Sequence, residues 1–409
     1  MNKNFKFIKI LSSIFSLFVV LLALNAQNLA SIDLTRAKFG IINADEIFEK
    51  FEFIPLETHK KGLLKVNEAT FYLTDKYIIG MNYLGPAYLF ERKTGAFIRE
   101  ISSRGRGPDE YTGWLSNQYG FDETNNILFA DVGSDSKPWK CINIETNKVE
   151  SIINKPLSEN NNEIFPAYVP WLIKDNVYVS FCNNLTGKDN IKLIVYNKEG
   201  TLIKIYPNHL EYKKLNARVY PAFYGIFYYY NGLTYFKEYN YNDTIYCVNE
   251  KNLTPHIIFN LGDKQPSYYH QENIDHSKGK YLIKFVCESN KIIMFNFVYN
   301  SYDAETIEFL GSKTLRKGKI PNLHTGYYDK KSKQVFISST PNFKTSGYTI
   351  SGIPISIHPI SINKNNEMIA KIDPADLLEH EDKIGSKYKH IFKNIQEEDN
   401  PVVVIAKVK

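Results

Sequence analysis

The chain alternates short apolar runs with polar turns, and this pattern repeats along most of its length. The turns of one series lie near Asp75, Asn125, Asp175, Gly232, Asn290 and Lys331. The turns of a second series lie near Gly95, Asn147, Gly200, Lys251, Asp303 and Asn365. Polar residues between two runs rich in Ile, Val, Phe and Tyr favour β-hairpins. The two interleaved series therefore predict six strand-turn-strand-turn units at a spacing of roughly 50 residues, which is typical of four-stranded propeller blades.

An even repeat favours one all-β domain, because a propeller closes all its blades into a single ring. We therefore expect a six-bladed β-propeller with four-stranded blades over residues 27–409. Aromatic residues make up 14% of the chain, and such residues favour strands that are buried between neighbouring blades. The run FYYYNGLTYF at 227–236 is an example.

The N-terminal residues predict export. Lys3, Lys6 and Lys9 precede an apolar stretch at 10–24, and small alanines follow it, which is the pattern of a secretory signal peptide. About 15 residues are fewer than the roughly 20 that span a bilayer. We expect cleavage after Ala26, no transmembrane segment after cleavage, and a mature chain in the periplasm, at the cell surface or outside the cell.

The net charge argues against a nucleic-acid partner. The signal peptide holds three lysines and no acid, so its removal lowers the formal charge from +6 to +3. Nucleic-acid-binding domains show a clustered basic face or a pI above about 9. The lysine doublets of this chain lie instead at turns or loops, where they are solvated.

The two faces of the predicted ring differ. Hairpin turns between the first and second and the third and fourth strands of each blade are short and form the short-turn face. The connections on the opposite face, here called the long-loop face, include 102–117, 153–170, 206–225, 262–280 and 338–355. Long loops on a rigid scaffold concentrate binding residues, so we expect function on the long-loop face.

The three tryptophans, Trp114, Trp139 and Trp171, fall in or next to these long connections. Such rings can stack on a sugar or clamp a peptide. The alternative is that they cap the ends of the core, since aromatic burial is commoner than aromatic recognition.

The sharpest local motif is RGRGPDEY at 104–111. Its glycines and proline hold the backbone in one tight course, and Arg104 and Arg106 could bind a carboxylate or phosphate. Alternatively, Arg106 and Glu110 pair within the loop and hold it against the next blade. The candidate ligand-binding residues are Arg104, Arg106, Glu110, Trp114 and Trp139.

No motif predicts a cofactor, a metal site or a known catalytic centre. Four cysteines lie far apart without CxxC spacing, which excludes zinc and thioredoxin-type sites and favours buried free thiols. His270 and His276, with Asp275 beside them, match no standard metal spacing. The sequence lacks GxSxG, HExxH and P-loop motifs.

Four segments together resemble a large bacterial family of secreted six-bladed β-propellers of unresolved function. They are FIPLET at 53–58, GRGPDEY at 105–111, YNDTIY at 241–246 followed by HIIFNLG, and EEDNPVVVI at 397–405. The resemblance implies a propeller fold and export, and it carries no established catalytic residues. Asp109 stands where that family usually has glycine.

The C-terminal residues depart from the repeat. Asp373 and Pro374 predict a helix start, and the apolar positions that follow share one face of an amphipathic helix at about 374–396. The strand at 401–408 is expected to join the 51–56 segment in closing the ring.

These observations favour a non-catalytic role. We expect an exported propeller that binds a glycan, a peptide or an envelope partner protein on its long-loop face. An extracellular hydrolase or lyase with its active site at the mouth of the central channel is the first alternative, since fold alone does not decide function. A structural subunit of a cell-envelope assembly is the second.

Overall fold

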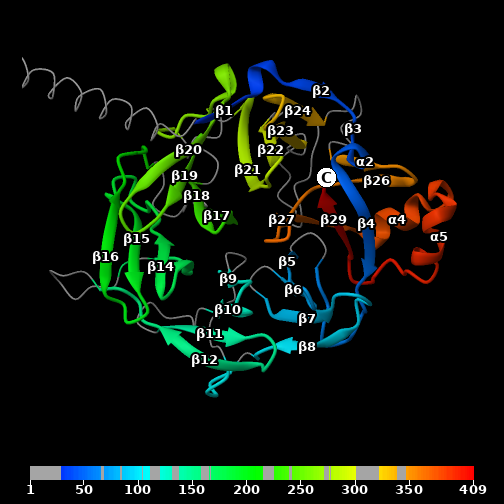
Figure 1. Ribbon diagram of the computed structural model, residues 1–409, viewed down its shortest axis with the longest axis horizontal. Coiled ribbons are helices and arrows are strands. Elements are labelled where there is room, and N and C mark those ends of the chain that lie inside the picture. The colour runs from blue at the N-terminus through cyan, green and yellow to red at the C-terminus, as the bar shows by residue number, and fades with distance from the viewer. Residues whose placement is uncertain are drawn as a thin grey trace, which may run out of the picture.

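The described strands form seven sheets arranged around a central axis, as the computed structural model shows (Figure 1). The all-β propeller prediction is confirmed, but the predicted number of six blades is wrong. The residues that the structure describes are 29–65, 69–82, 85–103, 105–110, 120–130, 138–157, 165, 167–214, 225–238, 242–270, 276, 278–300, 322–338 and 347–409. The predicted signal peptide lies outside them.

The first five blades each contain four consecutive strands. Blade 1 holds β5 (Thr70–Leu73), β6 (Tyr77–Met81), β7 (Ala87–Glu91) and β8 (Phe97–Ile101). Blade 2 holds β9 (Phe121–Asp122), β10 (Ile127–Ala130), β11 (Trp139–Asn143) and β12 (Lys148–Ile153). Blade 3 holds β13 (Trp171–Lys174), β14 (Val177–Phe181), β15 (Ile191–Asn197) and β16 (Leu202–Pro207).

The next two blades follow the same plan. Blade 4 holds β17 (Gly225–Tyr230), β18 (Leu233–Glu238), β19 (Thr244–Val248) and β20 (Leu253–Asn260), after which comes the 3-10 helix η2 (Gly262–Lys264). Blade 5 holds β21 (Lys280–Glu288), β22 (Ile292–Asn300), β23 (Asn322–Asp329) and β24 (Gln334–Ser338). The predicted hairpin turns near Asp75, Asn125, Asp175, Gly232 and Asn290 separate the first two strands of these five blades and are confirmed.

Blades 6 and 7 explain the wrong count. The stretch 338–355, interpreted from sequence as a loop, includes β25 (Tyr348–Ile350) and the start of β26 (Ile353–Ile357), which form blade 6 with β3 (Ile42–Asn43). The turn near Lys331 joins the last two strands of blade 5 and does not begin a new blade. Blade 7 holds β27 (Ser361–Ile362), β28 (Glu367–Ile372), β29 (Val402–Val408) and β4 (Phe48–Pro55).

The N-terminal strands run along four successive blades of the ring (Figure 1). β1 (Ala30–Asp33) pairs in parallel with β20 of blade 4, and β2 (Lys38–Gly40) pairs in parallel with β24 of blade 5. β3 then joins blade 6 and β4 joins blade 7. Between them lie the 3-10 helix η1 (Leu34–Arg36) and α2 (Ala44–Ile47). Residues 30–55, here called the N-terminal belt, therefore overlap the C-terminal half of the ring.

The ring closes where β29 pairs antiparallel with β4, from Val402 opposite Pro55 to Val408 opposite Phe48. This is the pairing expected from sequence for the apolar strand at 401–408. Because the last blade takes strands from both ends of the chain, opening the ring requires that this ladder break.

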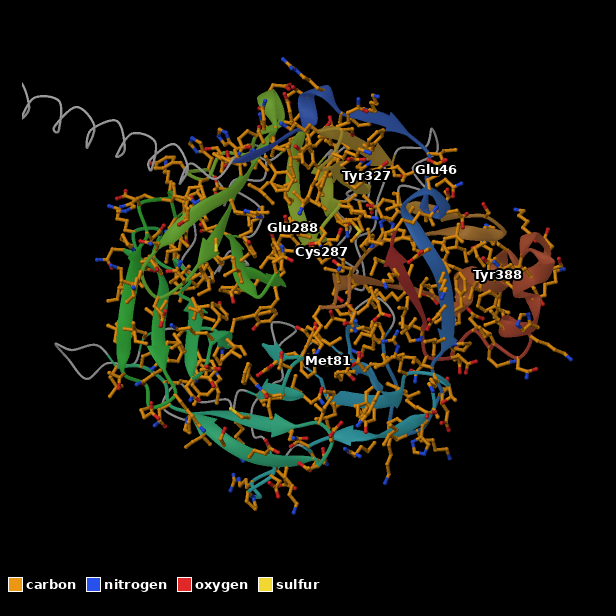
Figure 2. The ribbon with its side chains drawn as sticks, viewed as in Figure 1. Glu46, Met81, Cys287, Glu288, Tyr327 and Tyr388 are labelled. Atoms are coloured by element: carbon orange, nitrogen blue, oxygen red, sulfur yellow. The ribbon has the colours of Figure 1, made fainter. Side chains whose placement is uncertain are left out.

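The predicted C-terminal helix is present as three shorter pieces, α4 (Pro374–Glu379), the 3-10 helix η3 (Glu381–Lys383) and α5 (Ser386–Phe392). The Asp373 carboxylate accepts the Ala375 N–H, so the expected start is confirmed. The break has a packing cause, because the Gly385 N–H donates to the Gly352 carbonyl in the β25–β26 turn. Tyr388, on the helical projection outside the ring (Figure 2), packs edge-on against Phe53 of β4 at 5.0 Å.

The hydrophobic core lies mainly between neighbouring blades. One cluster, for example, joins Met81 of blade 1 (Figure 2) to Phe121 and Leu128 of blade 2. Charged contacts join blades as well. Glu288, at the end of β21 (Figure 2), is 3% exposed and accepts from His256 at 2.8 Å and from Lys330 at 2.6 Å.

Candidate functional site

The loop at 105–110 is held by its own acid. The Glu110 carboxylate accepts the Gly107 N–H at 2.7 Å and the Ser103 hydroxyl at 3.2 Å. A methyl group at Gly105 would lie 1.9 Å from a Glu110 carboxylate oxygen. Glycine at 105 therefore leaves the space that the Glu110 side chain occupies.

The same loop is fastened to the next blade. Lys140 of β11 donates to the carbonyl of Pro108 at 2.8 Å, of Gly107 at 3.3 Å and of Glu110. The Asp109 carboxylate accepts the Val149 N–H at 3.0 Å. These contacts hold the loop against blade 2, but they come from Lys140 and Asp109, and Glu110 accepts from Gly107 and Ser103 instead of forming the expected pair with Arg106.

The other sequence-predicted site residues fall in different surroundings. Arg106 is exposed. Arg104 and Trp114 lie outside the described residues and stay predictions. Trp139 is fully buried and stacks on Tyr196 at 5.9 Å, so it belongs to the core between blades 2 and 3 and offers no surface to a ligand.

A cavity of about 350 Å³ lies along the axis of the ring, lined by the first strands of blades 1, 2, 3, 4, 5 and 7. Four aromatic side chains of its wall are only half-buried, namely Tyr72, Trp171, Tyr229 and Phe285. Its volume is in the range of small-ligand pockets. Trp171 was not among the candidate ligand-binding residues, yet of the two tryptophans that the structure describes it is the one that presents ring surface to a cavity.

The aromatic wall between blades 3 and 4 is tightly positioned. The Trp171 ring packs on Phe227 and on Tyr229, with 5.4 Å between ring centres in both cases. The Tyr229 hydroxyl accepts the Leu172 N–H at 3.1 Å. Because both rings are fixed before any ligand arrives, stacking on them costs little conformational entropy.

Three acidic or basic residues share the cavity, namely Glu123 after β9, Lys284 on β21 and Lys364 in the β27–β28 turn. Burial raises the pKa of Glu123 to about 7, although the Lys364 N–H donates to its carboxylate at 3.1 Å. Burial lowers the pKa of Lys284 to about 8. Both shifts have the sign that desolvation of a charged group produces.

Glu123 and Lys364 also line a second, polar pocket of about 160 Å³ on the short-turn face. There the Asn365 side chain donates to Asp75 at 2.9 Å, and Lys76 lies 3.4 Å from Glu145. The central cavity and this pocket therefore meet at the Glu123–Lys364 contact.

A buried polar network lies between blades 3 and 4. Glu238 forms an ion pair with Lys192 at 2.5 Å and accepts the Tyr268 hydroxyl at 2.8 Å. Lys237 is fully buried and donates to the Glu238 carbonyl at 2.9 Å. Burial, with a smaller contribution from the charge of nearby Lys284, lowers the pKa of Lys237 to about 7 against the opposing charges of Glu238 and Asp243.

The YNDTIY motif supports this network. The Asn242 side chain accepts the Thr244 N–H at 2.9 Å, which forms an Asx turn, and its amide lies 3.5 Å from the Glu238 carboxylate. The motif therefore places the Asn242 amide beside the buried Glu238 carboxylate.

The residues missed from sequence are the cavity residues Tyr72, Glu123, Tyr229, Lys284 and Lys364. Those on strands could have been found from the predicted blades, because the first strand of each blade faces the axis and its alternate positions line the channel. Glu123 and Lys364 lie in hairpin turns, where charged residues are ordinarily solvated, so only the closed ring distinguishes them.

The cysteines and the His270–His276 pair lie apart from the cavity residues in the described part of the chain, except Cys287, which lines the cavity. All four cysteines are unpaired. The His270 and His276 rings stack at 4.0 Å, and no group of three or more His, Cys, Asp or Glu in this part could hold a metal ion. None of the described helices is long and apolar enough to cross a membrane.

Two solved structures show the same fold. A protein of Bacteroides fragilis NCTC 9343, named "Putative exported protein", is 16% identical with a TM-score of 0.65 over 93% of this chain and 100% of its own. A DUF4221 family member from Bacteroides vulgatus is 9% identical with a TM-score of 0.52 over 88% of this chain and 97% of its own. No curated protein matches the chain.

The resemblance implied six blades, and the structure corrects this number to seven. The segments that carry the resemblance are FIPLET, GRGPDEY, YNDTIY and EEDNPVVVI. One family model matches residues 29–407, nearly all of the chain after the predicted signal peptide. The chain belongs to this family, described as "Domain of unknown function (DUF4934)".

Proposed function

We propose that this chain is an exported, non-catalytic binding propeller that holds a glycan or peptide ligand in its central cavity. The observation that carries the proposal is the convergence of half-buried aromatic rings from blades 1, 3, 4 and 5 on one cavity of about 350 Å³. Rings of this kind offer a flat apolar face with a polar edge. Export is supported by the signal-peptide pattern and by the name of the Bacteroides fragilis neighbour.

The ligand enters from the long-loop face. The cavity begins at the first residues of β5, β13 and β17, and strands in these positions follow the long connections between blades. The Glu123–Lys364 contact occupies the opposite mouth. Arg106 is not part of this cavity, because its loop contacts the outer strands β11 and β12 of blade 2.

A thermal-shift screen of the mature chain against glycans and peptides tests the proposal, with Trp171→Ala as the site variant. A ligand at a hundredfold its Kd should add about 2.7 kcal/mol of apparent stability. Phe39→Ala is the matched control, because Phe39 is an exposed aromatic residue on β2 at the rim.

The shift should persist in Phe39→Ala and disappear in Trp171→Ala. Silence across the panel with all three proteins folded would remove the support for small-ligand binding. A shift of equal size in Trp171→Ala would place the binding site elsewhere.

A second function, hydrolase or lyase chemistry in the same cavity, is favoured by one specific observation. Burial raises the pKa of Glu123 to about 7, which is the range in which a carboxyl group can donate and accept protons at neutral pH. In that case Glu123→Gln should abolish turnover of a bound ligand and leave its binding intact. Binding without turnover in the unmodified protein supports the non-catalytic function.

A further inference from the structure

The N-terminal belt covers the outer strand of some blades and leaves that of others open. In blade 5, β2 adds in parallel to the outer strand β24, with Lys38–Gly40 opposite Phe336–Ser338. In blade 3 the outer strand β16, on the rim of the ring (Figure 1), pairs with β15 alone among the described strands. The chain itself therefore shows how an extended segment docks on an outer strand of this ring.

The open part of β16 corresponds to the covered part of β24. In blade 3, Lys204 pairs with the residue two positions before Asn197, where the last hairpin turn of the blade begins. In blade 5, Phe336 pairs with the residue two positions before Asp329, where the equivalent turn begins. The three residues from Lys204 onward therefore take the place of the three from Phe336 onward that carry β2.

Apolar side chains are exposed at this open edge. Ile203 and Ile205 are 43% and 37% exposed. Ile337, which corresponds to Ile205 and lies opposite Phe39 of β2, is fully buried. An edge strand with exposed apolar side chains is a template for pairing with a further strand.

The outer strands of blades 1 and 2 are already bound by side chains from elsewhere. The Phe97 N–H of β8 donates to Glu57 at 2.8 Å, and the Val149 N–H of β12 donates to Asp109 at 3.0 Å. Within the described residues, no hydrogen bond from outside blade 3 reaches the backbone of β16. Of the three blades without a belt strand, blade 3 therefore has the most open outer edge.

We propose that β16 binds an extended segment of a partner protein by parallel strand addition, with an acidic residue opposite Lys204 and an apolar residue opposite Ile205. Lys204 is exposed and forms no ion pair with a described residue, so an acid on the partner supplies the opposite charge across the strands. Main-chain hydrogen bonds provide the affinity, and the side-chain pairs select the partner. This surface lies on the rim, so it is separate from the central cavity.

Three features of β16 limit unspecific pairing, namely the charge of Lys204, the register shift at Ile203 and Pro207 at the end of the strand. They do not exclude an added strand. The outer strand β20 of blade 4 also has a register shift and a proline, Pro255, and it still pairs with β1. These features therefore restrict the edge to a partner that matches it.

The test is fluorescence anisotropy of the mature chain with labelled peptides of equal length, one of alternating Glu and Val and one of alternating Lys and Val. The unmodified protein should bind the Glu peptide more tightly. Two further Glu peptides carry backbone N-methyl groups, one at every Val and the other at every Glu. Because an added strand pairs along one edge alone, a single one of these two should lose binding.

Two measurements place the peptide on β16. Lys204→Glu exchanges an attractive cross-strand pair for a repulsive one, so the ratio of the affinities for the Glu and Lys peptides should fall by about tenfold. The matched control is Lys148→Glu, at an exposed lysine of β12, which should leave the ratio unchanged. Hydrogen exchange at 202–206 should slow when the Glu peptide is added, and exchange at 148–153 should not.

Four results overturn the proposal. The first is no binding of the Glu peptide, and the second is equal binding of the two N-methylated peptides, which shows charge attraction without strand addition. The third is slower exchange at 148–153 in place of 202–206, which moves the site to blade 2. The fourth is a dimer in sedimentation that protects 202–206, which makes a second copy of the chain the occupant. If Lys204→Glu does not fold, the N-methylated peptides and hydrogen exchange decide on the unmodified protein.

Discussion

Arg92 and Glu367 form a two-point ion pair at the seam where the seventh blade meets the first. The two nitrogen–oxygen distances are 2.6 Å and 3.0 Å, and the side chains are only 14% and 17% exposed. Arg92 follows β7, and Glu367 begins β28. The contact therefore joins residues 275 positions apart in sequence and reinforces the β4–β29 closure from a neighbouring blade.

Neutralising one partner of this pair should destabilise the ring. Glu367→Gln leaves the Arg92 guanidinium partly buried without its counter-charge, so we expect a loss of about 2–3 kcal/mol in urea unfolding, below the range for fully buried pairs. The matched control is Glu145→Gln, because the Lys76–Glu145 pair is exposed and should be worth less than about 1 kcal/mol. Equal effects in the two variants would contradict the role of the seam pair.

The same pair predicts acid sensitivity. Burial opposes ionisation of Glu367, but the hydrogen bonds from Arg92 and Asn363 and the Arg92 charge hold its pKa below the usual value. A carboxyl group whose folded-state pKa is depressed stabilises the fold above its unfolded pKa of about 4.3, and this stability is lost as the pH falls through the folded value. The unfolding free energy of Glu367→Gln should therefore depend less on pH below about 5 than that of the unmodified protein, with both measured in urea.

The hairpins could be predicted from sequence because each carries its own turn chemistry. Asn126, Asn147 and Asn176 adopt positive φ in such turns, as does Gly200, and these residue types tolerate that conformation. Blade 6 could not be predicted. Its strands β25 and β3 contain three and two residues, which is too short for a period of two to appear.

The residues that meet in the cavity could not be predicted from the sequence for a related reason. Tyr72, Glu123 and Lys284 come from three different blades, and their proximity exists only after the ring has closed. Trp171 lies in the cavity, and the sequence noted it only as a neighbour of a long connection, while the candidate list named Trp114 and Trp139 instead. The sequence could indicate a face of the ring and the strands that line its axis, but not the turn residues Glu123 and Lys364.

The N-terminal belt should contribute stability through buried contacts with blade 4. Ile32 of β1 is fully buried among residues of blades 4 and 5, so Ile32→Ala should cost about 2–4 kcal/mol. Ile41, in the same belt, is 70% exposed, and Ile41→Ala should stay within about 0.5 kcal/mol. Chemical denaturation of both variants measures the difference, and similar values would show that the belt does not pack on the ring in solution.

The loop at 105–110 should tolerate no side chain at its first position. Gly105→Ala forces the Glu110 carboxylate to move away from the added methyl group, which breaks its bond to the Gly107 N–H. Loss of this charge-assisted bond should cost about 1.5–3 kcal/mol.

The matched control for this loop is Gly40→Ala, because a methyl group at Gly40 meets nothing within 4 Å. Limited proteolysis should show cleavage near the loop in Gly105→Ala and not in Gly40→Ala. Identical digestion patterns would mean that the Glu110 contact does not order the loop.

Lys237 should make the protein more stable as the solution becomes more alkaline. Burial lowers its pKa to about 7, and Lys284 adds to this effect while Glu238 and Asp243 oppose it. Below about pH 7 the folded and unfolded chains both hold the proton. Between about pH 7 and about pH 10 the unfolded chain keeps it and the folded chain has released it, so raising the pH favours folding.

The unfolding free energy should accordingly rise by up to about 1.4 kcal/mol per pH unit from this group alone. Lys237→Met removes the titrating amine from the core, so its unfolding free energy should rise less steeply in urea titrations at pH 7, 8 and 9. Lys284 remains in that variant and retains its own smaller contribution, since its pKa is about 8. The exposed Lys148→Met should follow the unmodified protein. Parallel slopes for Lys237→Met and the unmodified protein would mean that Lys237 stays charged in the fold, held by the Glu238 carbonyl that it contacts at 2.9 Å.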